Sequence, residues 1–363
     1  MRVLYLTNIH NPYRDKFFEQ LGKKCDLTVL FERRLDLSRD SSWFDVDGTH
    51  SYREVFLPDN EGIYVSKTML STILEGWDLI IVGCYNEPKE ATAILWMRLR
   101  RIPYAVNLDG PLFNKTNPFK QILRRMVLRG ASIYYVAGRK SVASVRAEVG
   151  KGANIVPYLF SSLDKQGVKN LRCGSTPRES NVILCAGKYE EYKGLDILLE
   201  TASHLPRYRF KIVGMGRREA AFKQLVKRMG LDNIETDAFM SSEQLYAEMK
   251  SATLFVLPSR QECWGLVINE AAACGCPIVS TWGSGAAVEF LSDRYPHQLA
   301  ESGSKDSLLR AIDDALHMNP MDIDNYSSYL QEMSESYTIE SMVYSHMSTF
   351  ESICLSQKVE EGK

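Results

Sequence analysis

Two glutamates, Glu262 and Glu270, stand eight residues apart in the most informative stretch of the sequence. The apolar run Leu254–Leu257 predicts a buried strand, and Glu262 lies in the loop that follows it. Glu270 falls inside Leu266–Cys274, whose apolar spacing predicts a helix. The β-branched run Pro277–Ser280 predicts a second strand, parallel to the first. Because ligands bind outside the carboxyl ends of such strands, we expect both carboxylates to face one site.

The start of this predicted helix suits a phosphate. Backbone N–H groups around Trp264, Gly265 and Leu266, with Val267 in the same turn, open the helix and have no partners within it. Glycine at 265 lets the backbone approach a ligand closely. The two oxygens of Glu270 can accept both hydroxyl hydrogens of a ribose diol. These features fit an anionic sugar donor; a core helix with solvated glutamates is the alternative.

Two lysines follow the next predicted strand upstream, Asn181–Ala186. Gly187 and Lys188 come directly after this strand, and Lys193 precedes the glycine that opens the following helix. Lysines at the carboxyl end of a strand can pair with diphosphate oxygens. Solvated surface lysines are the alternative interpretation.

Two further turns are candidate donor contacts. Gly214 and Gly216 lie between a predicted strand and a helix, but the third glycine of the NAD-binding pattern is missing. Phe239 and Met240 follow a short predicted strand and precede a helix that a serine can cap. A plain strand-to-helix turn and a plain capping turn stay open as alternatives.

The first half of the chain offers acceptor contacts. Asp109 ends a buried strand in PYAVNLDGP, where it can orient or deprotonate a hydroxyl, or simply form an Asp-Gly turn. Asn8, His10 and Arg14 lie around the first strand-to-helix loop, and Tyr85 lies at another strand end. We keep these four as acceptor-side candidates, against turns that merely start helices.

Residues 118–130 combine basic and apolar side chains. The interval 115–151 contains nine Lys or Arg residues and one acidic residue, although the whole chain has a net charge of −1. The apolar spacing predicts an amphipathic helix, which either lies on an anionic membrane or packs its apolar stripe on the sheet. No stacking-aromatic motif accompanies the charges, so we expect no nucleic-acid partner.

The elements that must position these residues alternate between strands and helices, which indicates an α/β fold with doubly wound parallel sheets. The polar stretch Ser161–Ser180 is interpreted as a linker. We therefore expect one domain over 1–165, a second over 166–340, and a C-terminal helix with a frayed tail over 341–363. No apolar run approaches the ~20 residues that span a bilayer. The eight cysteines are scattered, so we expect buried reduced thiols in a cytoplasmic protein.

The segment PSRQECWGLVINEAAACGCPIVST resembles the E-x7-E signature of retaining glycosyltransferases with the GT-B fold, of the family-4 or group 1 type. The resemblance is strong over Asn181–Leu291 and diffuse over the first domain. It implies two Rossmann-like domains that face a central cleft, with a nucleotide-diphosphate sugar held by the second. It also implies that Glu270 holds the ribose and that Glu262 lies by the donor sugar. Lys188, which stands where the family has arginine, and Lys193 would stabilise the leaving diphosphate.

The same resemblance implies transfer of a hexosyl or N-acetylhexosaminyl group with retention, without a metal or another cofactor. The acceptor would be a saccharide or lipid-linked saccharide of surface polysaccharide assembly, with Asp109 where many members have a histidine. Two alternatives stay open. One is a non-catalytic subunit that keeps the nucleotide pocket. The other is a metal-dependent transferase that uses Asp45-Val46-Asp47 or Asp322-Ile323-Asp324, although neither follows a convincing buried strand.

Overall fold

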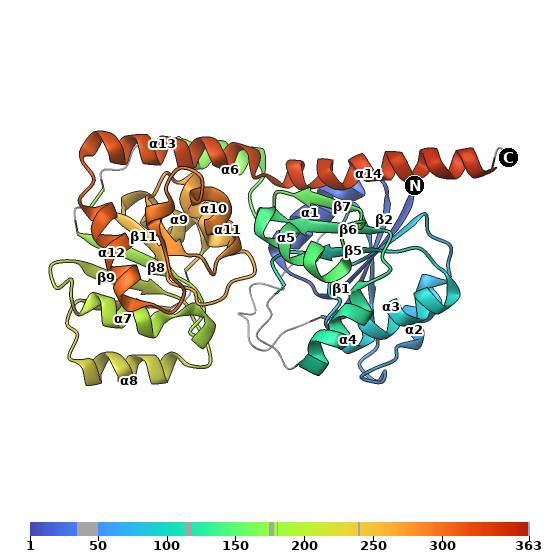
Figure 1. The fold of residues 1–363 in the computed structure, drawn as a ribbon, viewed down its shortest axis with the longest axis horizontal. Helices are drawn as coiled ribbons and strands as arrows, with labels where there is room; N and C mark the ends of the chain where they lie inside the picture. Colours follow the sequence, from blue (N-terminus) through green and yellow to red (C-terminus); the bar gives the residue numbers. More distant parts are fainter. Residues whose placement is uncertain (35–49, 113–117, 174–177, 180, 239, 362–363) are drawn as a thin grey trace. The chain divides into compact units, whose positions relative to one another are not determined.

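The computed structural model describes residues 1–34, 50–112, 118–173, 178–179, 181–238 and 240–361, and the side chains of all of these except 118–120 and 351–361. The chain divides into two compact units (Figure 1). The first consists of residues 1–162 together with 339–363, and the second of residues 163–338.

Within its described residues, the first unit contains a parallel sheet of seven strands in the order β3-β2-β1-β4-β5-β6-β7. Its strands are β1 (Arg2–Ile9), β2 (Asp26–Arg33), β3 (Arg53–Phe56), β4 (Leu79–Val82), β5 (Ala105–Leu108), β6 (Ile133–Ala137) and β7 (Ile155–Tyr158). Its helices are α1 (Pro12–Gly22), α2 (Lys67–Ile73), α3 (Pro88–Arg100), α4 (Pro118–Leu128), α5 (Gly138–Val149) and α14 (Ile339–Glu361). Helices cover the sheet, and every residue of the central strands β4 and β5 is buried. The sequences of these strands are therefore mostly apolar. The strand order reverses between β1 and β4, which opens a crevice beyond their carboxyl ends.

The second unit repeats this plan with a parallel sheet of six described strands in the order β10-β9-β8-β11-β12-β13. Its strands are β8 (Val182–Ala186), β9 (Arg209–Val213), β10 (Ile234–Asp237), β11 (Leu254–Leu257), β12 (Ile278–Thr281) and β13 (Leu299–Ala300). Its helices are α6 (Lys165–Arg172), α7 (Leu195–Ala202), α8 (Glu219–Met229), α9 (Ser242–Ser251), α10 (Leu266–Ala273), α11 (Gly285–Leu291), α12 (Lys305–Leu316) and α13 (Pro320–Ser336), with short 3₁₀ turns η2 (Glu191–Lys193) and η3 (Pro296–Gln298). Here the order reverses between β8 and β11, so the loops after these two strands flank the crevice.

The polar stretch that was interpreted as a linker contains a helix. Asp164 caps α6 by accepting from the Gly167 N–H at 2.6 Å. Val168 is the one buried residue of α6, and it packs with Leu163 and Ala273. The boundary between the two units lies inside the stretch, between Ser162 and Leu163, but residues 165–172 form a helix that is held by its cap and by apolar packing, and the polar composition of the stretch gave no signal of it.

The amphipathic helix α4 turns apolar side chains outward. Ile122, Leu123 and Met126 are 56%, 48% and 54% exposed. On the other side of α4, Arg124 and Arg125 both donate to the carboxylate of Glu148 on α5. Three apolar side chains of α4 are thus exposed at the surface, while two arginines of the same helix form ion pairs with Glu148 inside the unit.

The final helix α14 packs on α1 and β7 of the first unit. His346 on α14 is fully buried, and burial lowers its pKa to about 4. Its Nε2 lies 2.9 Å from Asn107 Oδ1, and its ring stacks on Tyr135 with 4.2 Å between centroids. The C-terminal segment is therefore joined to the sheet by specific polar and aromatic contacts.

No described helix has both the length and the apolar character that crossing a bilayer requires. Among the described residues, seven cysteines are free thiols. Cys173 and Cys263 are exposed, so the expectation of buried cysteines is wrong for these two. Cys354 lies outside the described side chains.

Candidate functional site

An ion pair lies at the point where the second sheet reverses its strand order. Lys193 ends η2 after β8, and Glu262 lies in the loop after β11. The Lys193 ammonium donates to Glu262 Oε2, and the Ser259 hydroxyl lies 3.4 Å from the same oxygen. The two ionic side chains are only 13% and 14% exposed. A partly buried charge pair at this crevice is suited to a polar or charged ligand.

The loops that carry Lys193 and Glu262 are locked together. The Arg260 N–H donates to the Tyr192 carbonyl at 2.8 Å, and the Arg260 guanidinium makes two hydrogen bonds of 2.7 Å to Asp196. These bonds lower the pKa of the Asp196 carboxyl below its usual range. Gly194 has φ 67°, and a Cβ there would overlap the Pro258 carbonyl oxygen. The distance between the two loops is thus fixed by backbone contact as well as by charge.

Helix α10 presents one partly exposed face. Leu266, Val267 and Glu270 are its half-buried residues, and the other five are buried. Glu270 lies on the same side of the helix as both others, because it follows Leu266 by four positions and Val267 by three. Gly265 adopts φ 94° directly before the helix, and its N–H and those that follow open the helix. The structure therefore brings the helix N-terminus and Glu270 to one surface.

Trp264 supports this loop from inside. Its side chain is 2% exposed, and the indole N–H donates to Asn269 Oδ1 at 2.9 Å. Its carbonyl accepts from the Ala286 N–H at 2.9 Å and from the Ser284 hydroxyl at 3.1 Å. The indole ring and the backbone carbonyl of Trp264 thus both hold the loop in place before α10.

Two glycines, Gly214 and Gly216, let the loops after β8 and β9 approach each other. A Cβ at Gly214 would overlap the Gly187 carbonyl oxygen, and a Cβ at Gly216 would lie 2.8 Å from the Tyr189 N–H nitrogen. Lys188 is exposed between these glycine contacts. Close backbone packing alone accounts for glycine at these positions, and it places Lys188 at the carboxyl edge of the sheet.

The turn before α9 is a capping box. The Ser241 hydroxyl accepts from the Gln244 N–H, and the Gln244 side chain accepts from the Ser241 N–H. Met240, directly before the cap, is half-buried. Phe239 lies outside the described residues.

In the first unit, one carboxylate oxygen of Asp109 is held from three sides. Oδ1 accepts from the Arg14 guanidinium, from the Tyr158 hydroxyl at 2.6 Å and from the Asn107 amide at 2.8 Å. Burial disfavours the charge of Arg14, but the Asp109 carboxylate raises the Arg14 pKa well above its ordinary value. The Asp109 side chain stays 34% exposed, whereas that of Arg14 is 6% exposed. Arg14 therefore orients Asp109 and has little surface of its own for an acceptor.

The other acceptor-side candidates differ in exposure. Asn8, in β1, is half-buried, and Tyr85, after β4, is half-buried against the core. His10 is 6% exposed, and its Nε2 lies 3.3 Å from Asp15 Oδ1. The structure thus leaves Asn8 and Tyr85 accessible and gives His10 protein partners.

Close to this crevice, the first turn of α3 buries Glu90. The side chain is 0% exposed, and neither carboxylate oxygen has a hydrogen-bond partner among the described residues. Burial, together with the nearby Glu32 carboxylate, raises the Glu90 pKa to about 8. Glu90 is therefore a buried acid that is mostly neutral at pH 7.

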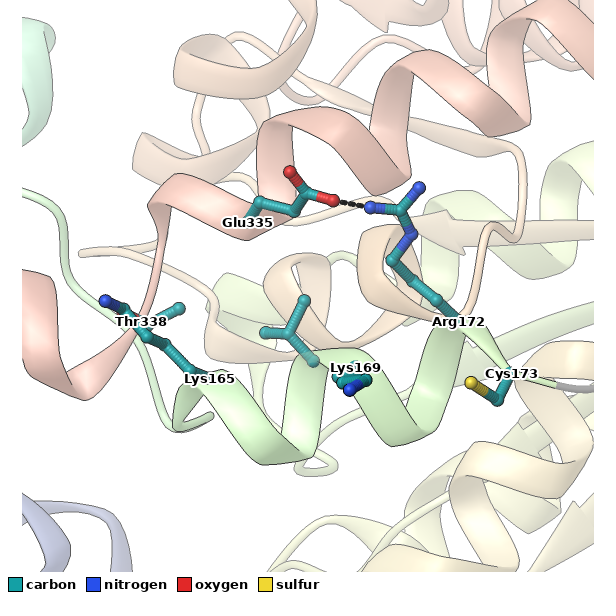
Figure 2. A pocket seen from close by; sticks show the side chains of 7 residues that line it. Lys165, Lys169, Arg172, Cys173, Glu335 and Thr338 are labelled. Carbon is teal, nitrogen blue, oxygen red and sulfur yellow. Dashed lines mark ion pairs between the residues drawn. The ribbon is translucent and has the colours of Figure 1, made fainter.

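A hollow of about 480 Å³ lies elsewhere in the second unit (Figure 2). Residues of α6 line it together with Cys173, with Glu335 at the end of α13 and with Thr338. Arg172 forms an ion pair with Glu335 across it. None of its lining residues comes from the loops after the strands, so we do not assign it to the site.

Several supporting residues escaped the sequence analysis. Arg260 and Asp196 carried no visible signal, because 64 positions separate them and each looks like a surface charge. Tyr158 is 49 positions away from Asp109 in the sequence. Asn107 is close to Asp109, but it looks like an ordinary residue of the predicted strand. The second Asp-x-Asp candidate, Asp322-Ile323-Asp324, lies in the first turns of α13 and follows no strand, and the first, Asp45-Val46-Asp47, lies outside the described residues.

Most of the second unit is similar to one family of known proteins. Residues 172–333 match the family model described as glycosyl transferases group 1. An uncharacterized glycosyltransferase of Haemophilus influenzae is 31% identical over 170 residues, which cover 46% of this chain and 47% of the relative. The D-inositol 3-phosphate glycosyltransferase of Mycolicibacterium smegmatis is 27% identical over 178 residues, which cover 47% of this chain and 41% of that relative. Each match thus spans less than half of the relative's length.

Solved structures resemble the chain over almost its entire length. HepE of Anabaena, in complex with UDP and glucose, superposes with a TM-score of 0.75 at 17% identity, covering 97% of this chain and 100% of HepE. Sucrose-phosphate synthase of Thermosynechococcus elongatus gives a TM-score of 0.73 at 16% identity, covering 98% and 100%. At this identity the likeness concerns the fold, which is the two-domain Rossmann-like GT-B fold predicted from the sequence.

Proposed function

We propose that this protein is a glycosyltransferase, because residues 172–333 match the family model described as glycosyl transferases group 1 and the chain has the GT-B fold. It transfers a hexosyl or N-acetylhexosaminyl group from a nucleotide-diphosphate donor to a saccharide or lipid-linked acceptor of surface polysaccharide assembly. The Lys193–Glu262 pair at the strand-order reversal carries the proposal, since it puts a cation and a carboxylate where a donor is expected.

Lys193 is proposed to stabilise the departing diphosphate. Glu262 keeps a cation at this position before any donor arrives, so the positive charge is already oriented when negative charge develops on the leaving group. Exposed Lys188 adds a second cation at the same edge. The N–H groups that open α10 after Gly265 supply further donors for phosphate oxygens.

Glu270 and the half-exposed face of α10 are proposed to hold the nucleoside. Glu262, whose Oε2 is held by Lys193 and lies near Ser259, is proposed to position the donor sugar during same-face transfer with retention. Asp109 is proposed to hold the acceptor hydroxyl, because one of its oxygens is fixed while the side chain remains partly exposed. The anomeric configuration of the product, determined by NMR, tests the retention.

The first experiment is a thermal-shift screen with UDP-, GDP- and dTDP-sugars, since a ligand that binds only the native state raises the melting temperature. UDP-sugars come first because HepE, which shares the fold, holds UDP and glucose. Donor hydrolysis and transfer are then measured with the sugar that binds. Binding without any turnover would favour a nucleotide-sugar-binding subunit, and no binding by any sugar nucleotide would refute the proposal.

In this proposal lysines, and not a metal ion, stabilise the negative charge on the leaving diphosphate. We therefore expect that Mg²⁺ and Mn²⁺ do not stimulate transfer. Strict dependence on either ion would instead favour a metal-dependent transferase. The free thiols of the described residues are consistent with action in the reducing cytoplasm.

A lipid-linked acceptor is supported by the exposed apolar residues of α4. Ile122, Leu123 and Met126 are about half exposed, and α3, which packs against α4, exposes Leu99 by 80%. Burying one such side chain in a lipid interface contributes up to about 1.5–3 kcal/mol. We therefore propose peripheral membrane contact through residues 118–130.

Co-sedimentation with vesicles tests this contact. Wild type should pellet with vesicles that contain phosphatidylglycerol, and Ile122→Gln and Met126→Gln should reduce the bound fraction. Leu74→Gln, a change at a residue that is 60% exposed after α2, is the matched control. Equal binding by all variants, or no binding by wild type, would contradict the membrane contact.

A further inference from the structure

Two histidines and three carboxylates converge at the edge of the first sheet. His10 follows β1, Asp15 and Glu19 lie one turn apart on α1, and His50 and Glu54 lie before and within β3. The side chains of His10, His50 and Asp15 are 7%, 12% and 13% exposed, and those of Glu19 and Glu54 are each 28% exposed. Neither the proposed donor site nor Asp109 uses this cluster.

Glu19 fixes the hydrogen on one histidine. The Glu19 carboxylate also accepts from the Ser51 hydroxyl at 2.7 Å and from the Ser51 N–H at 3.2 Å. Ionised Glu19 can only accept, so His50 Nδ1, at 2.7 Å from Glu19 Oε1, carries the hydrogen of that bond. In the neutral imidazole, Nε2 is then the nitrogen with the free lone pair.

The free lone pair of His50 faces other electron-rich atoms. His50 Nε2 lies 3.7 Å from Glu54 Oε1, and His10 Nε2 lies 3.6 Å from the same oxygen. His10 Nε2 is also 3.3 Å from Asp15 Oδ1. The lone pair of His50 Nε2 therefore faces a carboxylate oxygen, a contact that needs a cation or an additional proton, whereas His10 Nε2 either donates its hydrogen to Asp15 or, in the other tautomer, offers a second lone pair to an ion.

These distances fit the edges of a small coordination polyhedron. With zinc bonds of about 2.0–2.1 Å, neighbouring ligand atoms of a tetrahedron lie about 3.3–3.4 Å apart. The three separations above are 3.3, 3.6 and 3.7 Å, and the ligand atoms of His10, His50 and Glu54 all lie within 4.8 Å of one another. His10, His50 and Glu54 thus each place one ligand atom within reach of a single ion, whereas Asp15 lies beside His10 and on the Nδ1 side of His50.

We propose that His10, His50 and Glu54 bind a divalent transition-metal ion, with zinc a good match to two imidazoles and a carboxylate, and that Asp15, 3.3 Å from His10 Nε2, completes the site when it moves towards the ion. Two carboxylates balance the charge of the ion. Glu19 orients His50 through its other ring nitrogen, as carboxylates do for many histidine ligands of zinc. The Tyr52 hydroxyl donates to Asp15 and orients that carboxylate.

The ion would have a structural role. Its ligands come from the end of β1, from α1 and from the segment that enters the edge strand β3. β3 is half-exposed, and among the described strands it pairs only with β2. A metal bridge would join this edge to the helix beside it, and this inference does not depend on the proposed transferase activity.

The test uses full-length protein purified through an affinity tag that contains no histidine. Bound metal is measured by mass spectrometry; the protein is then treated with chelator and titrated with Zn²⁺ by calorimetry and thermal shift. We expect about one zinc per chain and a higher melting temperature with zinc. His50→Gln and Glu54→Gln should lose both effects, whereas His317→Gln, at a side chain that is 75% exposed, should retain them.

A milder variant separates ligation from folding. Glu19→Gln keeps every ligand but weakens the orientation of His50, so its zinc affinity should fall by about 10–100-fold. Wild type loaded with Co²⁺ should show the visible bands of a tetrahedral complex. Equal zinc binding by wild type and His50→Gln, or the absence of any zinc-dependent shift in wild type, would overturn the proposal. If wild type shows no zinc-dependent shift and its melting temperature instead rises as the pH is lowered, bound protons rather than a metal ion hold the cluster together.

Discussion

Glu90 provides a test of the electrostatics in which the magnitude follows directly from the structure. Its pKa is raised from 4.5 to about 8, chiefly because the side chain is fully buried. A group with a raised pKa in the folded state contributes its full stability below the unfolded pKa, near 4.5, and loses it as the pH rises towards 8. At one pKa unit per 1.36 kcal/mol, the ionisation of the unfolded chain reduces the free energy of unfolding by about 3 kcal/mol between pH 4.5 and 7.

Glu90→Gln keeps the shape of the neutral acid and removes this titration. We expect the variant to match wild type near pH 4 and to exceed it by about 3 kcal/mol at pH 7, which is several degrees of melting temperature for a domain of this size. Urea and thermal unfolding at a series of pH values measure the difference. Glu75→Gln, at an exposed glutamate of the same unit, should follow the wild-type profile. A wild-type pH slope that persists in Glu90→Gln would refute the reasoning.

The proposed donor site yields three further predictions. Glu270→Gln should weaken donor binding by about 1.5–3 kcal/mol in calorimetry, whereas exposed Glu200→Gln should not, and equal affinities would remove Glu270 from the site. Lys193→Met should lower kcat more than it weakens ground-state donor binding, and a purely proportional loss in both would contradict a role in the transition state. Asp196→Asn should lower the free energy of unfolding at pH 7 but not at acidic pH. The lowered pKa of the Asp196 carboxyl gives stability that is lost as the pH falls through that pKa. A difference in unfolding free energy between wild type and variant that is the same at every pH would count against the Arg260 contact.

The sequence was sufficient for the parts of the fold that carry a continuous apolar signal. β11 has the bounds predicted for it, because four buried residues end at Pro258. β3 and β7 were not predicted, and both are edge strands. Neither is fully buried, and β7 contains Pro157, so the apolar pattern that identifies central strands is absent from both.

The candidate site could be predicted only as separate residues. Lys193, Glu262 and Asp109 were selected because each follows a predicted strand. Which of these loops meet depends on strand order, and strand order is set by packing between distant segments. The contact of Lys193 with Glu262 across 69 positions, and that of Arg14 with Asp109 across 95, therefore became visible only in the structure. The roles of these residues in donor and acceptor binding stay predictions.

The attachment of α14 limits how this chain can be divided for laboratory work. Through His346 and Asn107, the last helix is connected to the hydrogen bonds that hold Asp109, although more than two hundred residues intervene in the sequence. A fragment that stops at Ser162 would leave a hydrophobic surface bare and an amide without its partner. An isolated first half should therefore be made by fusing the terminal helix to residue 162 through a short flexible tether, and deletions from the carboxyl terminus should stop well before His346.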